Sequence, residues 1–250
     1  TLLILGQGTT VIILDQRQRQ DIGLARHGDM SQEFQVDILR PFGPRILRAK
    51  MPMEYVNALN EQCDKILQDD NKRKELDESA ELVGHVAEEL RCDMNVPEMN
   101  PFGKFLGNLT RGLHDEFMKE KGTRGNDAIP QQIIIHSSWF VRSFEADYNP
   151  THIHTNGTFS CVAYLKVPEG ISEKNTRNTK EKYATEGYID FIYGSSSIVT
   201  PGNLCCMPVV GDLFVFPSHL FHTVYPFFGE GERRSFSANI SLTSEQNNGS

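Results

Sequence analysis

The chain has 250 residues, of which 38% are hydrophobic and 23% charged, and its mean hydropathy is −0.40. This composition is ordinary for a soluble globular protein that can bury a sizeable core. The formal net charge of −8 argues against non-specific binding to DNA or RNA, because such binding depends on neutralising phosphates. No segment reaches the length of a membrane span, so no membrane partner is expected.

The five cysteines show no C-x-x-C spacing; they are Cys63, Cys92, Cys161, Cys205 and Cys206. An odd number without metal-binding spacing is typical of reduced thiols rather than of a disulfide framework or a zinc ribbon. We therefore expect a cytoplasmic protein.

The first 37 residues are predicted to be an N-terminal extension, because they carry no strong pattern. Residues 2–14 are apolar but interrupted by Gly6 and Gly8, which suits a short hairpin at the edge of the fold. Residues 36–39 and 46–47, separated by a Pro-Phe-Gly-Pro turn, indicate strand, turn and strand.

Two amphipathic helices are predicted in the first half of the chain. Pro52 opens the first, whose apolar stripe consists of Val56, Leu59, Cys63 and Ile66. The charged residues 68–80 indicate a solvated helix end or loop. The second helix, over about 101–121, has a stripe that we interpret as core packing, formed by Phe102, Phe105, Leu106, Leu109, Leu113 and Phe117.

From residue 133 onward the pattern is that of short strands separated by turns. Strands are predicted over 133–144, 158–167, 189–193, 205–210, 211–216, 222–225 and 233–242. Many short strands with frequent turns indicate a double-sheet barrel of the jelly-roll kind. Residues 168–187 are polar and long for a connection, so they are predicted to form a mobile loop near a binding site.

The most informative stretch contains His152 and His154, separated by one residue. In an extended strand, residues two apart point the same way, so the two imidazoles are expected to bind a metal together. His222 begins a later strand and is predicted to complete the site at the barrel mouth. His219 precedes it in a turn and is expected to face solvent.

A second polar pattern lies on the predicted strand 233–242. Arg233, Ser235 and Asn239 share one face of this strand, whereas Arg234 and Phe236 lie on the other. A polar face that points inward must line a wet cavity. An Arg with a Ser two residues later can bind a carboxylate through a forked, charge-assisted contact and a further hydrogen bond.

Taken together, these stretches resemble the 2-oxoglutarate- and iron(II)-dependent oxygenases, in particular the prolyl-4-hydroxylase-like oxygenases common in phages and marine bacteria. The resemblance covers about 134–241. It depends on the sequences YNPTHIH (148–154), FSCVAYLKVP (159–168), GDLFVFP (211–217), HTV (222–224) and RRSFSAN (233–239).

The resemblance implies a mainly β (α+β) fold, a double-stranded β-helix with helices packed outside its larger sheet. One such domain over 38–245, with helices within 52–122, would follow the N-terminal extension. The implied cofactors are iron(II), held by His152, His154 and His222, and 2-oxoglutarate, held by Arg233, Ser235 and Tyr164. The implied activity is that of a dioxygenase that hydroxylates its substrate and releases succinate and CO2.

The sequence departs from the family pattern at His154, where a carboxylate is expected. His154 is either a true third ligand, which we favour, or the carboxylate comes from elsewhere, with Asp147 the nearest candidate. In a third interpretation Asn156 takes the place of the acid.

Two other functions are compatible with these residues. A three-histidine cupin-type dioxygenase that does not use 2-oxoglutarate explains His154 but leaves Arg233 and Ser235 without a role. A catalytically inactive jelly roll that acts as a binding module explains the missing carboxylate. The expected partner is a small-molecule or peptide substrate, and neither its identity nor the oligomeric state follows from the sequence.

Overall fold

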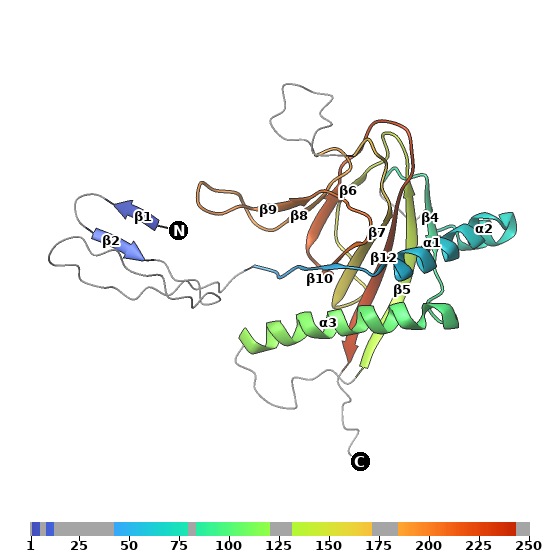
Figure 1. Ribbon diagram of the computed structural model, residues 1–250, viewed down its shortest axis with the longest axis horizontal. Coiled ribbons are helices and arrows are strands. Elements are labelled where there is room, and N and C mark those ends of the chain that lie inside the picture. Colours follow the sequence, from blue (N-terminus) through green and yellow to red (C-terminus); the bar gives the residue numbers. More distant parts are fainter. Residues whose placement is uncertain are drawn as a thin grey trace, which may run out of the picture. The chain divides into compact units, whose positions relative to one another are not determined.

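The computed structural model describes residues 2–5, 9–12, 43–79, 84–120, 132–171 and 185–243 (Figure 1). The chain divides into two compact units, residues 1–43 and 44–250. In the first unit, β1 (Leu2–Leu5) and β2 (Thr9–Ile12) pair antiparallel, so the predicted hairpin pairing is present. The second unit holds all the predicted site residues and is described below. No described helix is both long and apolar enough to cross a membrane.

The larger sheet of the second unit has six described strands in the order β3-β10-β7-β12-β5-β4 (Figure 1). All neighbouring strands in it are antiparallel. Their bounds are Leu47–Lys50 for β3, Glu88–Arg91 for β4, Gln132–Ser143 for β5, Phe159–Lys166 for β7, Asp212–Pro217 for β10 and Arg233–Thr243 for β12.

The smaller sheet has four described strands in the order β6-β11-β8-β9, also antiparallel. Their bounds are Asn149–His152 for β6, Ile189–Ile192 for β8, Asn203–Cys206 for β9 and Phe221–Val224 for β11. Side chains of the two sheets meet in one buried cluster, which joins Tyr164, Phe214 and Phe216 to Ile189 and Phe191. The two sheets therefore face each other, and the expected double-stranded β-helix is confirmed.

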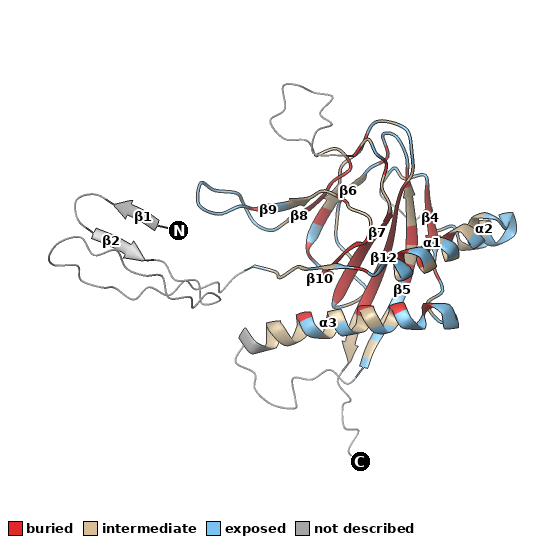
Figure 2. Cartoon of the chain, viewed as in Figure 1, coloured by how far each residue is buried: buried red, intermediate tan, exposed pale blue. Residues whose placement is uncertain are grey.

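The helices pack against the outer face of the larger sheet. They are α1 (Met53–Leu67), α2 (Asp70–Leu76), the short 3-10 helix η2 (Pro97–Met99) and α3 (Asn100–Glu120). The buried residues of α1 are those of the predicted stripe, Val56, Leu59, Cys63 and Ile66. Figure 2 shows the opposite side of α1, and all of α2, as exposed or half-buried.

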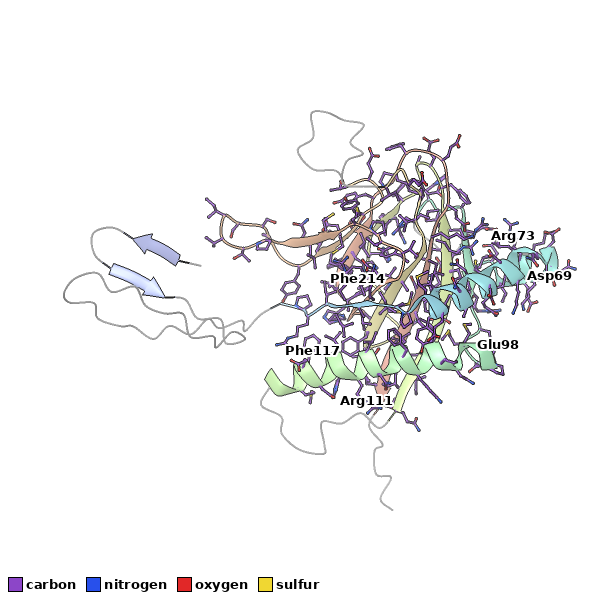
Figure 3. The ribbon with its side chains drawn as sticks, viewed as in Figure 1. Asp69, Arg73, Glu98, Arg111, Phe117 and Phe214 are labelled. Carbon is purple, nitrogen blue, oxygen red and sulfur yellow. The ribbon has the colours of Figure 1, made fainter. Side chains whose placement is uncertain are left out.

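The apolar stripe of α3 packs in the same way, so its interpretation as core is confirmed. Phe102 packs edge-on against Phe236 of β12, with ring centroids 5.3 Å apart. Phe117 lies between α3 and the sheet (Figure 3), and its ring centroid is 6.1 Å from that of Phe159. Burying a fully buried aromatic side chain such as Phe102 contributes roughly 2–3 kcal/mol of transfer free energy, so this contact helps to fix α3 against the sheet.

Strand β12 separates two environments by the alternation of its side chains. Phe236, Ala238 and Ile240 belong to the core beneath the helices. Arg233 and Ser235 are also buried, but on the opposite face, between the sheets. The predicted assignment of β12 side chains to two faces is therefore confirmed.

Several sequence predictions differ from the structure or fall outside it; among them, the strand predicted over 205–210 is β9 at Asn203–Cys206. Strand β4 was not predicted, because its sequence EELR lacks the β-branched residues that mark strands. Residues 70–76 form helix α2, which has no buried residue, at the site of the predicted solvated segment. The predicted strand over 36–39 lies outside the described residues, as does 172–184, most of the predicted mobile loop.

A network of charged side chains connects β12 to α1 and β5 on the helix side of the larger sheet. The Arg234 side chain is only 1% exposed, and its Nε donates to Glu232 Oε1 at 2.8 Å. Its Nη1 donates to Asp64 Oδ1 on α1 at 2.7 Å. Arg142 of β5 donates to the same Glu232 carboxylate at 2.7 Å and also binds Glu88. Glu232 therefore compensates two largely buried guanidinium groups.

Burial raises the pKa of Glu232, but hydrogen bonds from Arg234 and Arg142 outweigh it and hold this pKa below its usual value. A carboxylate whose pKa is lowered by folding stabilises the fold above its unfolded pKa of about 4.3. That contribution is lost as the pH falls through the folded pKa.

We expect Glu232→Gln to lower the free energy of unfolding by about 3 kcal/mol at pH 7, since it leaves Arg234 and Arg142 undercompensated. Urea unfolding at pH 7 and pH 3 measures this, and the difference from wild type should shrink at pH 3. Glu61→Gln, on the exposed face of α1, is the control and should change little. An equal loss at both pH values would contradict the electrostatic explanation.

Candidate metal and cosubstrate site

Three histidine side chains converge at one end of the smaller sheet. His152, the last residue of β6, lies directly opposite His222 of β11 in the strand pairing. His154 lies two residues beyond the end of β6, where its backbone N–H donates to the carbonyl of Ser218 at 2.9 Å. One ligand atom from each imidazole lies within 4.8 Å of the others. The predicted trio is therefore brought together, although His154 lies outside the strand that the sequence predicted for it.

Backbone carbonyls orient two of the three rings. His152 Nδ1 lies 2.7 Å from the carbonyl oxygen of Pro150, and His222 Nδ1 lies 3.0 Å from that of Leu220. A carbonyl oxygen only accepts, so Nδ1 carries the proton in both rings. The Nε2 lone pairs are then available to a metal, as is usual for metal-binding imidazoles that donate their other N–H to an oxygen.

Burial keeps the three imidazoles neutral. It lowers the pKa of His152 and, together with the neighbouring His152, lowers that of His154 to about 4. The pKa of His222 falls to about 3, through burial first and then through His152 and His154, against a hydrogen bond to Leu220 that raises it. Metal binding requires the neutral form of histidine, so the site needs no deprotonation at neutral pH.

Aromatic side chains surround the cluster. The ring centroids of Phe216 and Phe191 lie 5.0 and 6.2 Å from that of His222. Trp139, on β5, lies 5.5 Å from His154. Sequence reasoning did not identify this wall; the single Trp of the chain, within an apolar strand, was the available signal.

The alternative ligands are not part of the cluster. Asp147 is buried, but its carboxylate accepts the backbone N–H groups of Ala87 and Phe144 at 3.0 and 2.8 Å and lies 3.1 Å from His85 Nδ1. Asn156 is exposed and absent from the group of converging ligands. His219 lies exposed in the turn after β10, as predicted.

The predicted carboxylate-binding residues lie between the two sheets. The Arg233 side chain is buried, with its guanidinium carbon 5.3 Å from the centroid of the Tyr164 ring. Ser235 pairs directly opposite Tyr164 in the ladder between β12 and β7. The structure therefore brings together all three residues that the family resemblance assigned to 2-oxoglutarate.

Two polar atoms in this group are buried without a hydrogen-bond partner among the described residues. They are the hydroxyl of Tyr164 and Nε of Arg233. Leaving a buried polar group unpaired typically costs about 1–3 kcal/mol. Burial raises the pKa of Tyr164, an effect that Arg233 opposes, so the phenol remains protonated and can donate. Both residues can therefore donate hydrogen bonds to an anionic ligand.

Comparison with known proteins identifies the class. Residues 137–239, less than half of the chain, match the family described as "Putative 2OG-Fe(II) oxygenase". No curated protein matches the chain. The match includes all three histidines, Arg233, Ser235 and Tyr164. The matched segment is thus similar to the iron(II)- and 2-oxoglutarate-dependent oxygenases, a class of dioxygenases, and the resemblance to this class inferred from the sequence is confirmed.

Similar solved structures include AviO1 from Streptomyces viridochromogenes Tue57, at 11% identity and a TM-score of 0.50, covering 80% of this chain and 90% of that one. A prolyl-4-hydroxylase from Pseudomonas putida is 14% identical with a TM-score of 0.49, covering 80% and 92%. The likeness to AviO1 concerns the fold alone. The family match favours 2-oxoglutarate chemistry over the cupin-type dioxygenase and over the inactive binding module.

The geometry of Asp147 predicts a structural role. Asp147→Ala should lower the free energy of unfolding by about 2 kcal/mol, since it leaves the N–H groups of Ala87 and Phe144 without their acceptor. Metal content per chain, measured by mass spectrometry on folded protein, should stay at the wild-type value. Loss of metal with unchanged stability would instead identify Asp147 as a ligand.

Proposed function

We propose that His152, His154 and His222 bind the iron(II) of this oxygenase. The observation that carries the proposal is the convergence of three neutral imidazoles, two of them with Nε2 free and Nδ1 bound to a carbonyl. Imidazole nitrogen is a suitable ligand for iron, and three facial ligands leave positions for a cosubstrate and oxygen. With three neutral ligands the iron is more positive than with two histidines and a carboxylate, which favours an anionic cosubstrate.

We propose that Arg233 binds the far carboxylate of 2-oxoglutarate, with Tyr164 and Ser235 as further donors. The support is the unpaired state of Arg233 Nε and the Tyr164 hydroxyl between the sheets. A carboxylate placed there would satisfy both groups. The forked guanidinium would also hold it in one orientation, as a point charge would not.

When bound, iron(II) and 2-oxoglutarate supply the oxidation of substrate by O2, with succinate and CO2 as coproducts. The residues of this chain orient the bound groups and exclude water. Carbonyls of Pro150 and Leu220 fix two imidazoles, and Phe216, Phe191 and Trp139 form the apolar wall. Such a wall strengthens the electrostatic contacts inside the site.

We propose further that the reaction is the hydroxylation of a small molecule or a peptide, in the cytoplasm. A reducing compartment is supported by the cysteines, all five of which are free thiols, three of them buried. Burial raises the pKa of the Cys63 thiol to about 11 and of the Cys92 and Cys161 thiols to about 12, so these buried groups are unreactive.

Metal binding tests the histidine assignment. His222→Gln, which keeps most of the buried volume, should weaken iron(II) binding by more than about 100-fold, since even outer-shell substitutions cost roughly 10- to 100-fold. His219→Gln, in the exposed turn of the same segment, is the matched control and should bind as wild type does. Anaerobic iron(II) titration measures both. Unchanged affinity in a folded His222→Gln protein would show that His222 is not a ligand.

The unusual third ligand is tested separately. His154→Asp restores the carboxylate of the family pattern and should retain or raise iron(II) affinity, whereas His154→Ala should weaken it. Mass spectrometry of metal content at limiting iron compares the variants. Equal metal content in wild type, Asp and Ala variants would remove His154 from the site.

The cosubstrate assignment predicts the behaviour of Arg233. Arg233→Ala should weaken 2-oxoglutarate binding roughly ten- to a hundred-fold, because a charge-assisted contact worth about 1.5–3 kcal/mol is lost. Arg233→Lys should recover part of it. Arg91→Ala, exposed on β4, is the control. The charge-transfer absorbance of the anaerobic iron(II) complex reports the affinity, and an unchanged affinity in Arg233→Ala would show that Arg233 does not bind the far carboxylate.

A further inference from the structure

A bulge in strand β5 turns two consecutive side chains toward the same face. In the pairing with β12, Asn239 lies opposite Ser137 and Ile240 lies opposite Ile135. His136 therefore has no residue of β12 opposite it. On β5, Ile133 and Ile135 before the bulge and Phe140 after it pack on the helix-side core. The side chains that face the helices therefore change from odd to even residue numbers at the bulge. His136 and Ser137 therefore both point away from the helices. Bulges beside active sites commonly redirect side chains in this way.

Four side chains form a directed chain of hydrogen bonds on that face. The Ser160 hydroxyl donates to Asn239 Oδ1 at 2.9 Å, and Asn239 Nδ2 donates to the Ser137 oxygen at 3.1 Å. A hydroxyl has one proton, so Ser160 must accept from Ser218, whose oxygen is 2.9 Å away. Ser137 is thus an acceptor toward Asn239, and its own proton is left to donate elsewhere.

The end of this chain opens into a pocket of about 340 Å3 lined by His136, Ser137, Asn156 and Gly157. Residues near the pocket in the chain and in the hydrogen-bond network also contact His154. Asn156 follows His154 by two residues, and Trp139, two residues beyond Ser137 on β5, lies 5.5 Å from the His154 ring. Ser218, at the other end of the chain, accepts the backbone N–H of His154.

We infer that this pocket is a substrate-binding subsite in which Ser137 donates a hydrogen bond to an uncharged carbonyl or carboxamide group of the substrate. The inference rests on the proposed function, because the lining residue Asn156 lies two residues from the proposed iron ligand His154. His136 and Asn156 flank Ser137 and supply further polar contacts. The bulge is what makes the subsite: without it, only one of His136 and Ser137 would face the pocket.

The composition of the pocket selects a neutral group. The lining residues include no Lys, Arg, Asp or Glu, so a substrate carboxylate would find no opposing charge there. Asn156 both donates and accepts, which complements an amide with its C=O and N–H. Ser160, Ser218 and Asn239 are buried and fix the direction of the hydrogen bond to Ser137, so the exposed Ser137 hydroxyl presents its proton to the substrate group.

Paramagnetic relaxation in solution tests the inference. The intact protein is loaded with cobalt(II) and 2-oxoglutarate, and N-acetylglycine N-methylamide is added as the probe. Binding in the pocket should speed the relaxation of the probe's acetyl methyl protons relative to the zinc(II)-loaded protein. Ser137→Ala should weaken probe binding about two- to tenfold, and Ser137→Thr, which keeps the hydroxyl, should restore it. Ser195→Ala, on the exposed connection between β8 and β9, is the matched control.

Each other outcome overturns the inference. If cobalt(II) binds but the probe shows no extra relaxation, or if Ser137→Ala and Ser195→Ala behave alike, the subsite is wrong while the proposed function stands. If the carboxylate N-acetylglycine binds as tightly as the amide, the preference for a neutral group is wrong. If cobalt(II) itself does not bind, the proposed function fails and the inference fails with it.

Discussion

The pairing of β6 with β11 is the constraint on which the site depends. It places His152 opposite His222 and sets their ring centroids 4.2 Å apart. Imidazoles packed so closely in a buried place cannot all be protonated, and burial lowers the pKa of each. The backbone therefore holds the cluster in the form that binds metal before any metal arrives. His154 joins it through one backbone hydrogen bond to Ser218, on the turn that leads into β11.

Two neighbouring arginines on β12 show how one strand serves two environments. Arg234 points to the helix side, where Glu232 and Asp64 compensate its charge. Arg233 points between the sheets, where its Nε has no described partner. Both side chains are almost fully buried, so the difference lies in their surroundings rather than in their exposure. A buried guanidinium whose donors are incompletely paired is well suited to an anionic ligand, whereas one matched by carboxylates contributes to the fold.

The face of the larger sheet that points between the sheets carries two separate groups of polar side chains. Arg233 and Tyr164 lie at one end of β12 and β7, and Asn239 and Ser160 lie at the other. Ser235, Ser237 and Val162 lie between these two groups. In the proposed function the cosubstrate carboxylate would bind near Arg233, and in the further inference the uncharged substrate group would bind beyond Asn239.

Much of the fold and site followed from sequence periodicity alone. The stripes of α1 and α3 and the alternation along β12 are local patterns, and a local pattern determines which face of an element is buried. The sequence spacing also identified His152, His154 and His222 as candidates, and the family resemblance added Asp147 and Asn156 as alternatives for the third ligand.

The tertiary structure decided what spacing could not. The carboxylate of Asp147 is satisfied by backbone groups of Ala87 and Phe144, contacts that no local pattern encodes. The bulge at His136 exists only because β5 is paired with β12, and the hydrogen-bond direction at Ser137 depends on residues 23 to 102 positions away. The sequence by itself determined the identity of the candidate ligands and the faces they occupy. Strand pairing between distant segments decides which of these ligands meet and which polar groups remain without partners. That pairing exists only in the assembled barrel.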